Sequence, residues 1–102
     1  MALTTVYGQD AIKAVASVTL SSSYLGAGNY VTIQRARKAD LWCDDSSIAL
    51  TYKFSYDGGT TFTPDMPLGA GSVYTAEPPL GRTLTIDVKS ASGTPKLGVL
   101  VY

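Results

Sequence analysis

The stretch IALTYKFSYDGGTTF, residues 48–62, decides the fold class because it joins a strand pattern to a turn signal. Large apolar side chains occupy every second position from Ile48 to Tyr56, and small or polar residues lie between them. Side chains on a β-strand alternate between the two faces of a sheet, so this period of two indicates a strand with one buried face. We expect Tyr52 and Phe54 to point into a hydrophobic core.

Two glycines follow this strand, where the chain has to reverse direction. Gly58 and Gly59 allow the positive φ angles that a tight hairpin requires. The short carboxylate of Asp57 can accept hydrogen bonds from backbone N–H groups across the turn. We therefore expect a structural turn here. Its predicted members are Ser55, Asp57, Gly58, Gly59, Thr61 and Phe62.

The spacing S-x-D-x-G-x-T-F resembles the Asp-box, a β-hairpin corner found in sialidases and in many unrelated β proteins. In sialidases the box recurs in each propeller blade on the side away from the chemistry, whereas this chain holds one copy. A glycosidase site would need two carboxylates flanking the scissile bond, and we expect the backbone to occupy the oxygens of Asp57. We interpret the corner as a fold device, in which Thr61 returns a hydroxyl bond and Phe62 sends its ring back to the core.

Period-two alternation continues along the rest of the chain. It predicts further strands in residues 12–21, 30–36, 39–44, 82–90 and 96–102, and weaker ones in residues 3–7 and 72–76. Short strands separated by turns at about 8–12-residue spacing are typical of all-β sandwiches. We expect one all-β domain, residues 1–102, folded as an antiparallel β-sandwich of jelly-roll type with seven to nine short strands.

Two segments fit the strand pattern less well. Residues 64–81 contain four of the five prolines, which cannot donate to a sheet ladder, so we expect a long Pro/Gly-rich loop or a sheet edge there. Long loops in compact domains are often functional, and this one is a candidate contact arm. Residues 1–9 are a candidate N-terminal arm, unless residues 3–7 already form a strand.

The composition leaves little chemistry for a catalytic site. The chain has no histidine, and Cys43 is its only cysteine. Histidine is the commonest general base and metal ligand, so we expect no activated nucleophile, no metal site and no cofactor. The carboxylates of Asp40, Asp44 and Asp45 lie close in sequence, but their spacing matches no calcium loop, and a solvated acidic turn is expected. We predict that the protein is not an enzyme.

The balance of charged residues limits which partners the chain is expected to bind. Eight basic residues balance eight acidic ones, so we expect neither nucleic acid nor an anionic membrane as a partner. Charged residues make up 16% of the chain, below the roughly 25% of typical soluble domains, which suits a surface that packs against neighbouring proteins. The first ten residues lack a secretory signal and no apolar run approaches a membrane span, so we expect a protein that folds where it is made.

Trp42 is one candidate for contact with a partner. It points away from the apolar face of its predicted strand, where an interface contact is more favourable than exposure to water. The other candidate interface residues are Tyr7, Met66, Leu68 and Tyr74. Exposed tyrosines could also stack on sugars, so a glycan partner stays open.

The second half of the chain, residues 49–102, resembles small β-sandwich proteins of tailed-bacteriophage virions. The resemblance lies in the run ALTYKFSYDGGTTF, the turn LGAG, the strand LTIDV and the closing SGTPKLGVLVY. It implies a virion accessory protein made in the host cytoplasm and not secreted, either a capsid decoration (cement) protein or a piece of tail, fibre or neck. The implied partners are the major capsid protein, other virion proteins and further copies of the chain. The position in the virion and the oligomeric state stay open.

A carbohydrate-binding module is the alternative function. It predicts a line of coplanar exposed aromatic rings and measurable affinity for a glycan. A cement protein predicts no glycan affinity and tight, stoichiometric binding to assembled shells.

Overall fold

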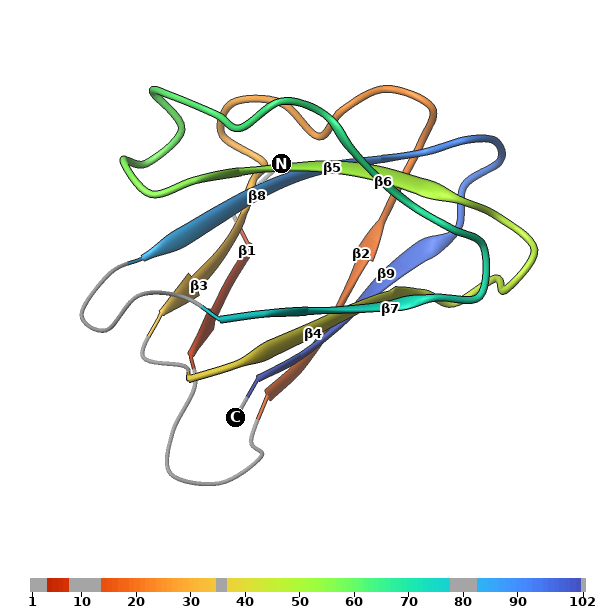
Figure 1. The fold of residues 1–102 in the computed structure, drawn as a ribbon, viewed down its shortest axis with the longest axis horizontal. Helices are drawn as coiled ribbons and strands as arrows, with labels where there is room; N and C mark the ends of the chain where they lie inside the picture. The colour runs from red at the N-terminus through yellow and green to blue at the C-terminus, as the bar shows by residue number, and fades with distance from the viewer. Residues whose placement is uncertain (1–3, 8–13, 35–36, 78–82, 102) are drawn as a thin grey trace.

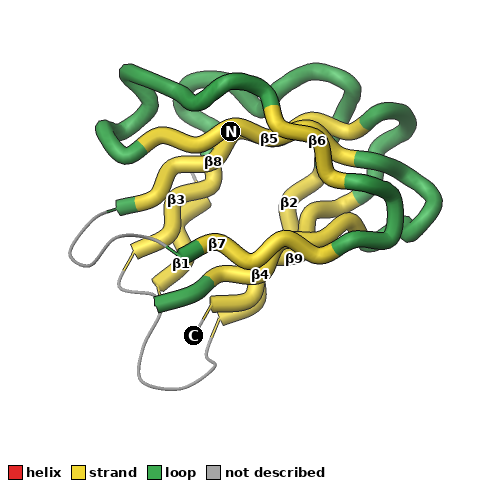
Figure 2. The backbone as a smooth tube through the Cα atoms, viewed as in Figure 1, coloured by secondary structure: helices red, strands yellow, loops and turns green. Residues whose placement is uncertain are grey.

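Nine β-strands form two sheets that pack face to face in the computed structural model (Figure 1). It describes residues 4–7, 14–34, 37–77 and 83–101 and, within these ranges, the side chains from Val18 onward. All regular secondary structure in this part of the chain is strand (Figure 2). The predicted all-β sandwich is therefore confirmed.

One sheet has five strands in the order β1-β3-β8-β5-β6. These strands are β1 (Thr4–Tyr7), β3 (Val31–Gln34), β8 (Leu84–Ser90), β5 (Leu50–Ser55) and β6 (Met66–Leu68). The other sheet has four strands in the order β2-β9-β4-β7. These strands are β2 (Ala14–Thr19), β9 (Lys96–Val101), β4 (Ala39–Cys43) and β7 (Val73–Ala76). Neighbouring strands are antiparallel except β1 and β3, which pair in parallel.

The strand pairing follows the winding of a jelly roll. Four antiparallel strand pairs are nested one inside another, like successive parts of a single long hairpin. From the outside inward they are β2–β9, β3–β8, β4–β7 and β5–β6. In each pair the midpoint between partner residues falls within residues 57–59, at the tip of the β5–β6 hairpin. The pairs β5–β8 and β4–β9 join the rolled hairpin into two sheets, which is the double Greek-key arrangement of jelly rolls. β1 is an additional strand beside β3.

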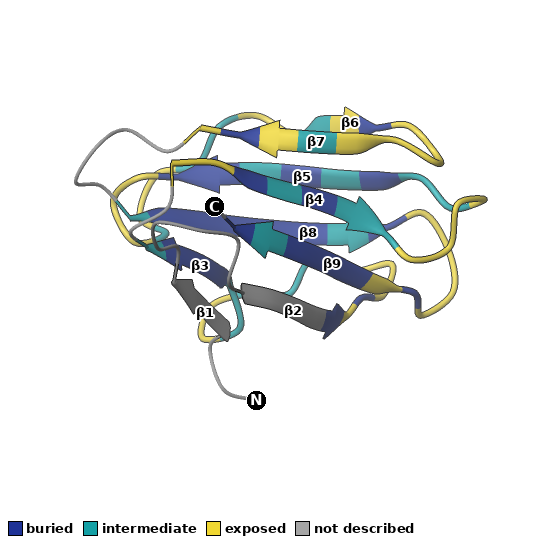
Figure 3. Cartoon of the chain, turned by 90° about the horizontal axis from the view of Figure 1, so that it is seen from below, coloured by how far each residue is buried: buried dark blue, intermediate teal, exposed yellow. Residues whose placement is uncertain are grey.

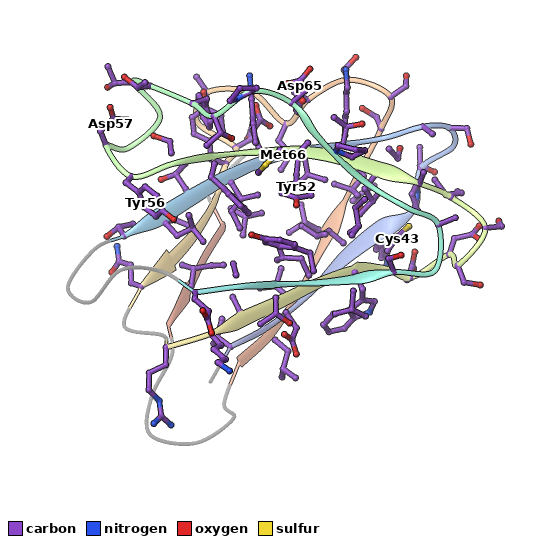
Figure 4. All side chains as sticks on the ribbon, viewed as in Figure 1. Cys43, Tyr52, Tyr56, Asp57, Asp65 and Met66 are labelled. Carbon is purple, nitrogen blue, oxygen red and sulfur yellow. The ribbon has the colours of Figure 1, made fainter. Side chains whose placement is uncertain are left out.

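The core lies between the sheets and is built mainly from alternate residues of strands β3 to β9 (Figure 3). On β5 the predicted face is confirmed, because Leu50, Tyr52 and Phe54 are buried and the intervening Lys53 is partly exposed. Tyr52 points between the two layers (Figure 4). The ring centroids of Tyr52 and Phe54 lie 4.9 and 5.4 Å from that of Tyr74 on β7. Three tilted rings therefore tie the two sheets together.

Several details differ from the sequence expectations. Residues 64–81 are not one loop, because they contain β6 and β7. Both are edge strands, so the expected sheet edge and the weaker strand predicted in residues 72–76 are confirmed. Pro67 is accommodated because β6 is a sheet edge, where proline is tolerated. Thr4–Tyr7 form β1, which confirms the weaker strand predicted in residues 3–7 and leaves no free arm there. The parallel β1–β3 pair departs from an all-antiparallel sandwich. Tyr56 follows the end of β5 and is exposed instead of sharing its inner face.

We expect Phe54→Ala to lower the free energy of unfolding by about 3–5 kcal/mol, because it removes a buried ring and leaves a cavity in the aromatic cluster. Thr51→Ala, on the opposite face of the same strand, is the matched control and should change stability by less than about 1 kcal/mol. Urea unfolding followed by circular dichroism measures both variants. Equal losses in the two variants would contradict the assigned faces of β5.

Candidate functional site

The corner between β5 and β6 is held by one carboxylate and one hydroxyl, with Asp57 at the hairpin tip (Figure 4). Asp57 Oδ1 accepts hydrogen bonds from the Ser55 hydroxyl at 2.6 Å and from the N–H groups of Thr60 and Thr61 at 3.1 and 2.9 Å. Ser55 Oγ in turn accepts the Gly59 N–H at 2.9 Å. These bonds satisfy backbone donors that the turn leaves without ladder partners.

Two glycines complete the corner. Gly58 and Gly59 have φ angles of 78° and 97°, in the left-handed region, as the sequence predicts. A Cβ on Gly59 would also press against the ring of Tyr30. Where the turn rejoins the sheet, the Phe54 N–H donates to Thr63 Oγ1 and the Thr63 N–H donates to the Phe54 carbonyl. The corner is therefore a single hydrogen-bonded unit.

The corner carries one carboxylate with a low pKa and no second carboxylate. Hydrogen bonds to the carboxylate lower the pKa of Asp57 from 3.8 to about 2. The bond from the Ser55 hydroxyl contributes most, and the bond from the Thr61 N–H comes next. An open pocket of about 320 Å³ beside the corner is lined mainly by apolar groups, including the rings of Phe54 and Phe62. Asp57 is the one carboxylate in that lining. This geometry is that of a turn, because glycoside hydrolysis uses a pair of carboxyl groups.

Phe62 does not return to the core, and that part of the prediction is wrong. Its ring centroid lies 4.7 Å from Lys53 Nζ and 5.3 Å from the ring centroid of Tyr30, on the outer face of the five-stranded sheet. The residues between Ser55 and Thr63 form a wide loop, so the strand alternation of β5 does not carry through to Phe62. An edge-on aromatic contact and a cation–π contact take the place of core burial.

The chain itself covers this outer face. Tyr24, in the segment between β2 and β3, contacts two ammonium groups, with Lys53 Nζ and Lys89 Nζ 4.5 and 4.7 Å from its ring centroid. Its hydroxyl donates to Asp65 at 2.6 Å. Burial, followed by the bond to Asp65, raises the pKa of Tyr24 above its ordinary value, so the hydroxyl stays a donor. The segment is thus fastened to the sheet by intramolecular contacts.

A buried carboxylate under the same segment was missed by sequence reasoning. Asp87 on β8 is only 3% exposed although its side chain points away from the core. Its Oδ1 accepts the Gly26 N–H at 3.3 Å, and it lies directly opposite Lys53 in the β5–β8 ladder. The alternation marked this position as solvent-facing, and no local signal shows that a distant segment folds over it.

The acidic turn after β4 is held by its own hydrogen bonds. Asp45 Oδ1 accepts the hydroxyl and N–H of Ser47 at 2.6 and 3.0 Å, and these bonds lower the pKa of Asp45. Asp44 Oδ1 accepts the Lys96 N–H at 2.8 Å. Cys43 is half-buried and packs against the core. Within the described residues, no group of three or more histidine, cysteine or acidic side chains could hold a metal ion.

The outer face of the four-stranded sheet presents Trp42, which points away from the core as predicted. Trp42 and Gly98 are direct partners in the β4–β9 ladder, and a Cβ on Gly98 would overlap the indole. The ring therefore lies on bare backbone, which is a recurrent reason for a glycine inside a strand. On its other side Trp42 pairs with Val73, which is 60% exposed, and Leu100 is on the same face. These three residues, Trp42, Val73 and Leu100, are named the Trp42 patch.

Two polar side chains border the Trp42 patch. Asp40 and Thr75 are partners in the β4–β7 ladder, and the Thr75 hydroxyl donates to Asp40 Oδ1 at 2.6 Å. Their positions alternate with those of the inward-facing residues, so both lie on the outer face with Trp42. An apolar centre with a polar rim is the usual anatomy of a protein contact surface.

Three other predicted interface residues belong to the core packing. Leu68 is buried, and Met66 and Tyr74 pack against the core cluster. Their side chains are occupied within the sandwich because β6 and β7 are strands, whose alternate residues point inward, and not parts of a flexible loop. We therefore leave them out of the proposed contact surface. Tyr7 lies in β1, and its side chain is outside the described residues.

Comparison with known proteins assigns the chain to no family. No family model, no curated protein and no solved structure matches it. Within the described part of the chain, no helix has the length and apolar character needed to cross a membrane.

Asp57→Asn tests the corner through pH. Because the pKa of Asp57 is lowered to about 2 in the folded protein, its ionised form stabilises the fold fully above the ordinary carboxyl pKa. That contribution is lost as the pH falls from about 4 to about 2. We expect the variant to melt several degrees below the wild type at neutral pH, and this difference to shrink in acid. Thermal unfolding between pH 7 and pH 2 measures it, and parallel curves would contradict the assignment.

Gly98→Ala tests how Trp42 is seated. The chain contains one tryptophan, so its fluorescence reports on the patch alone. We expect the new methyl group to push the indole off β9, with a red-shifted emission maximum and stronger quenching by acrylamide. Gly69→Ala is the matched control, because a Cβ there meets only Ser72 Oγ at 3.5 Å and should leave the spectrum unchanged. An unchanged spectrum in Gly98→Ala would show that the ring does not lie on this glycine.

Proposed function

We propose that this chain is a structural protein of a tailed-bacteriophage virion, a capsid decoration or cement protein that binds the assembled shell through the Trp42 patch. The observation that carries the proposal is the difference between the two outer faces of the sandwich. Tyr24 and its segment cover one face, whereas the other presents an indole beside a 60% exposed Val73. Exposed apolar patches with a polar rim mark contact surfaces.

The proposal of a virion protein as the partner is based on the resemblance of residues 49–102 to virion β-sandwich proteins. This resemblance supports the major capsid protein, or another virion protein at the neck, tail or fibre, as the surface on which the patch sits. Jelly rolls are common in viral capsids, but they also serve many other functions, so the fold by itself does not choose a partner.

Cementing a shell requires contact area and no reaction. A small module adds buried surface across a joint between shell subunits, and each such contact is weak when it lies below the size of a stable interface. Many copies bound to one particle, or several contacts made by one oligomer, strengthen the attachment through effective concentration. The zero net charge keeps electrostatic repulsion between neighbouring copies small. We therefore expect strong binding to assembled shells and weak binding to free capsid subunits.

A glycan-binding module is the second candidate, favoured by the polar pair beside the indole. The free face of Trp42 could stack on a sugar ring, and Asp40 with Thr75 could bond its hydroxyl groups. Yet the remaining members of the patch, Val73 and Leu100, are aliphatic and offer no second stacking platform. A protein partner fits this composition better.

Purified virions provide the decisive test of the location. We expect the protein at a fixed copy number in each particle, and cryo-electron microscopy to show the Trp42 patch against a neighbouring subunit. Absence of the protein from purified virions would overturn the proposal. Binding to a glycan array, without binding to shells, would support the second candidate in its place.

Trp42→Ala tests the proposed surface directly. Truncating a tryptophan at the centre of an interface commonly costs about 2 kcal/mol or more, so we expect at least about a tenfold loss of shell binding. Tyr56→Ala is the matched control, because it removes a 43% exposed ring at the β5–β6 corner and should leave binding unchanged. Co-sedimentation with shells that lack the protein measures both. Full binding by Trp42→Ala would place the contact elsewhere.

A further inference from the structure

β7 (Val73–Ala76) is an open edge of the four-stranded sheet. Within the described residues it pairs on one side only, with β4. Every second residue of an edge strand directs its N–H and C=O away from the sheet, so β7 presents a row of backbone donors and acceptors. Outside the ladders, the described residues make no backbone–backbone hydrogen bond to residues 73–77. The row is therefore available to another strand.

The other edges of the sandwich are less accessible to a new strand. β6, the edge strand of the other sheet at the same margin, has three residues and includes Pro67, which lacks an N–H (Figure 3). At the opposite margin the edge strands β1 and β2 lie against each other, one in each sheet. β7 is also short, with four residues, but it has neither the proline nor the charged residues that commonly protect a sheet edge.

The residues of β7 favour strand pairing. Valine, tyrosine and threonine are the residue types most enriched in strands, and they occupy positions 73–75. The two carboxylates beside β7 already have partners within the chain. Asp40 on β4 accepts the Thr75 hydroxyl at 2.6 Å, and Glu77, the residue after β7, pairs with Lys38 at 3.5 Å. The chain as a whole has no net charge, so two copies would approach without long-range repulsion.

We infer that β7 pairs antiparallel with β7 of a second copy, about a two-fold axis perpendicular to the sheet. Such an axis keeps the outer face of both copies on the same side of the joined sheet. Outer-face residues must therefore lie opposite outer-face residues, which requires the axis to pass through a residue of β7 and not between two residues. Centred on Tyr74, the pairing sets Val73 opposite Thr75 of the second copy. Centred on Thr75, it sets the two Thr75 residues opposite each other. Neither register opposes like charges, and both give a continuous eight-stranded sheet.

The pairing has a consequence for the outer face. Val73 is a direct neighbour of Trp42 and also a residue of the joining strand. A dimer would therefore carry two Trp42 patches on one extended sheet surface, and two linked contacts bind more tightly than one. The inference does not rest on the proposed virion function, because it follows from the backbone and side chains of β7 alone.

Light scattering coupled to size-exclusion chromatography tests the pairing in the isolated protein. We expect a species of two chains, each of 10.7 kDa, that grows with protein concentration. Val73→Lys places a lysine at the junction and should raise the dimer dissociation constant at least about tenfold. Thr19→Lys, an exposed outer-face position on the opposite edge strand β2, is the matched control and should leave the dimer intact.

A second variant separates edge pairing from adhesion through the patch. Trp42→Ala keeps the edge of β7 and should still dimerise. Loss of the dimer in Trp42→Ala, with Val73→Lys unaffected, would overturn the inference and assign self-association to the patch.

Cysteine cross-linking identifies the register. In a Cys43→Ser background, Thr75→Cys should form a disulfide between copies if the pairing is centred on Thr75, because directly opposite Cα atoms lie about 4.5–5.5 Å apart. A mixture of Val73→Cys and Thr75→Cys proteins should form the mixed disulfide if the pairing is centred on Tyr74. Thr19→Cys should form none. A protein that stays monomeric into the millimolar range and forms neither disulfide would refute β7 pairing, whatever its behaviour toward virions.

Discussion

The hydrogen bonds of Asp57 and Ser55 at the β5–β6 corner are the constraint on which the rest of the sandwich depends. In each of the four nested strand pairs, the midpoint in sequence between paired residues lies at the tip of this corner. β5–β6 is the innermost pair and β2–β9 the outermost. Closing a long loop costs more conformational entropy than closing a short one, so each inner pair lowers the cost of the next. A carboxylate that satisfies the backbone of the innermost turn therefore supports pairings far away in sequence.

The two outer faces of the sandwich illustrate two ways of treating a sheet surface. On the five-stranded sheet, the ring of Tyr24 makes cation–π contacts with Lys53 and Lys89. The buried carboxylate of Asp87 accepts a backbone N–H from the segment that covers it. On the four-stranded sheet, no described segment covers Trp42, and the backbone of Gly98 supports the ring from below. The polar and aromatic groups on the outer face of the five-stranded sheet thus contact other parts of the chain, whereas those on the four-stranded sheet face outward.

The strands and the corner were predictable because their signals are local. Alternation along residues 50–54 gave the buried face of β5, and the Ser-Asp-Gly-Gly spacing gave the turn that the hydrogen bonds now show. The errors have a common cause in long-range structure. Phe62 lies on the outer face because Tyr30 and Lys53 meet it there, and neither residue is a sequence neighbour.

The candidate site divides in the same way. The outward direction of Trp42 followed from alternation, but its seat on Gly98 depends on the register between β4 and β9, which no local pattern encodes. Proline and glycine hide the short strand β6 from the sequence pattern, and the four residues of β7 give only a weak strand signal, so the inward direction of Met66, Leu68 and Tyr74 is not predictable from sequence. Edge strands of three or four residues are too short for alternation to be distinguished from chance.

The place of β9 in its sheet affects how the chain can fold during synthesis. β9 lies between β2 and β4, and it is the last of the three to leave the ribosome. At about 5–20 residues per second, translation from Cys43 to Lys96 takes several seconds, during which β2 and β4 have no shared partner. β4 can already pair with β7 during that time, whereas β2 has no partner in its sheet until β9 has been synthesised.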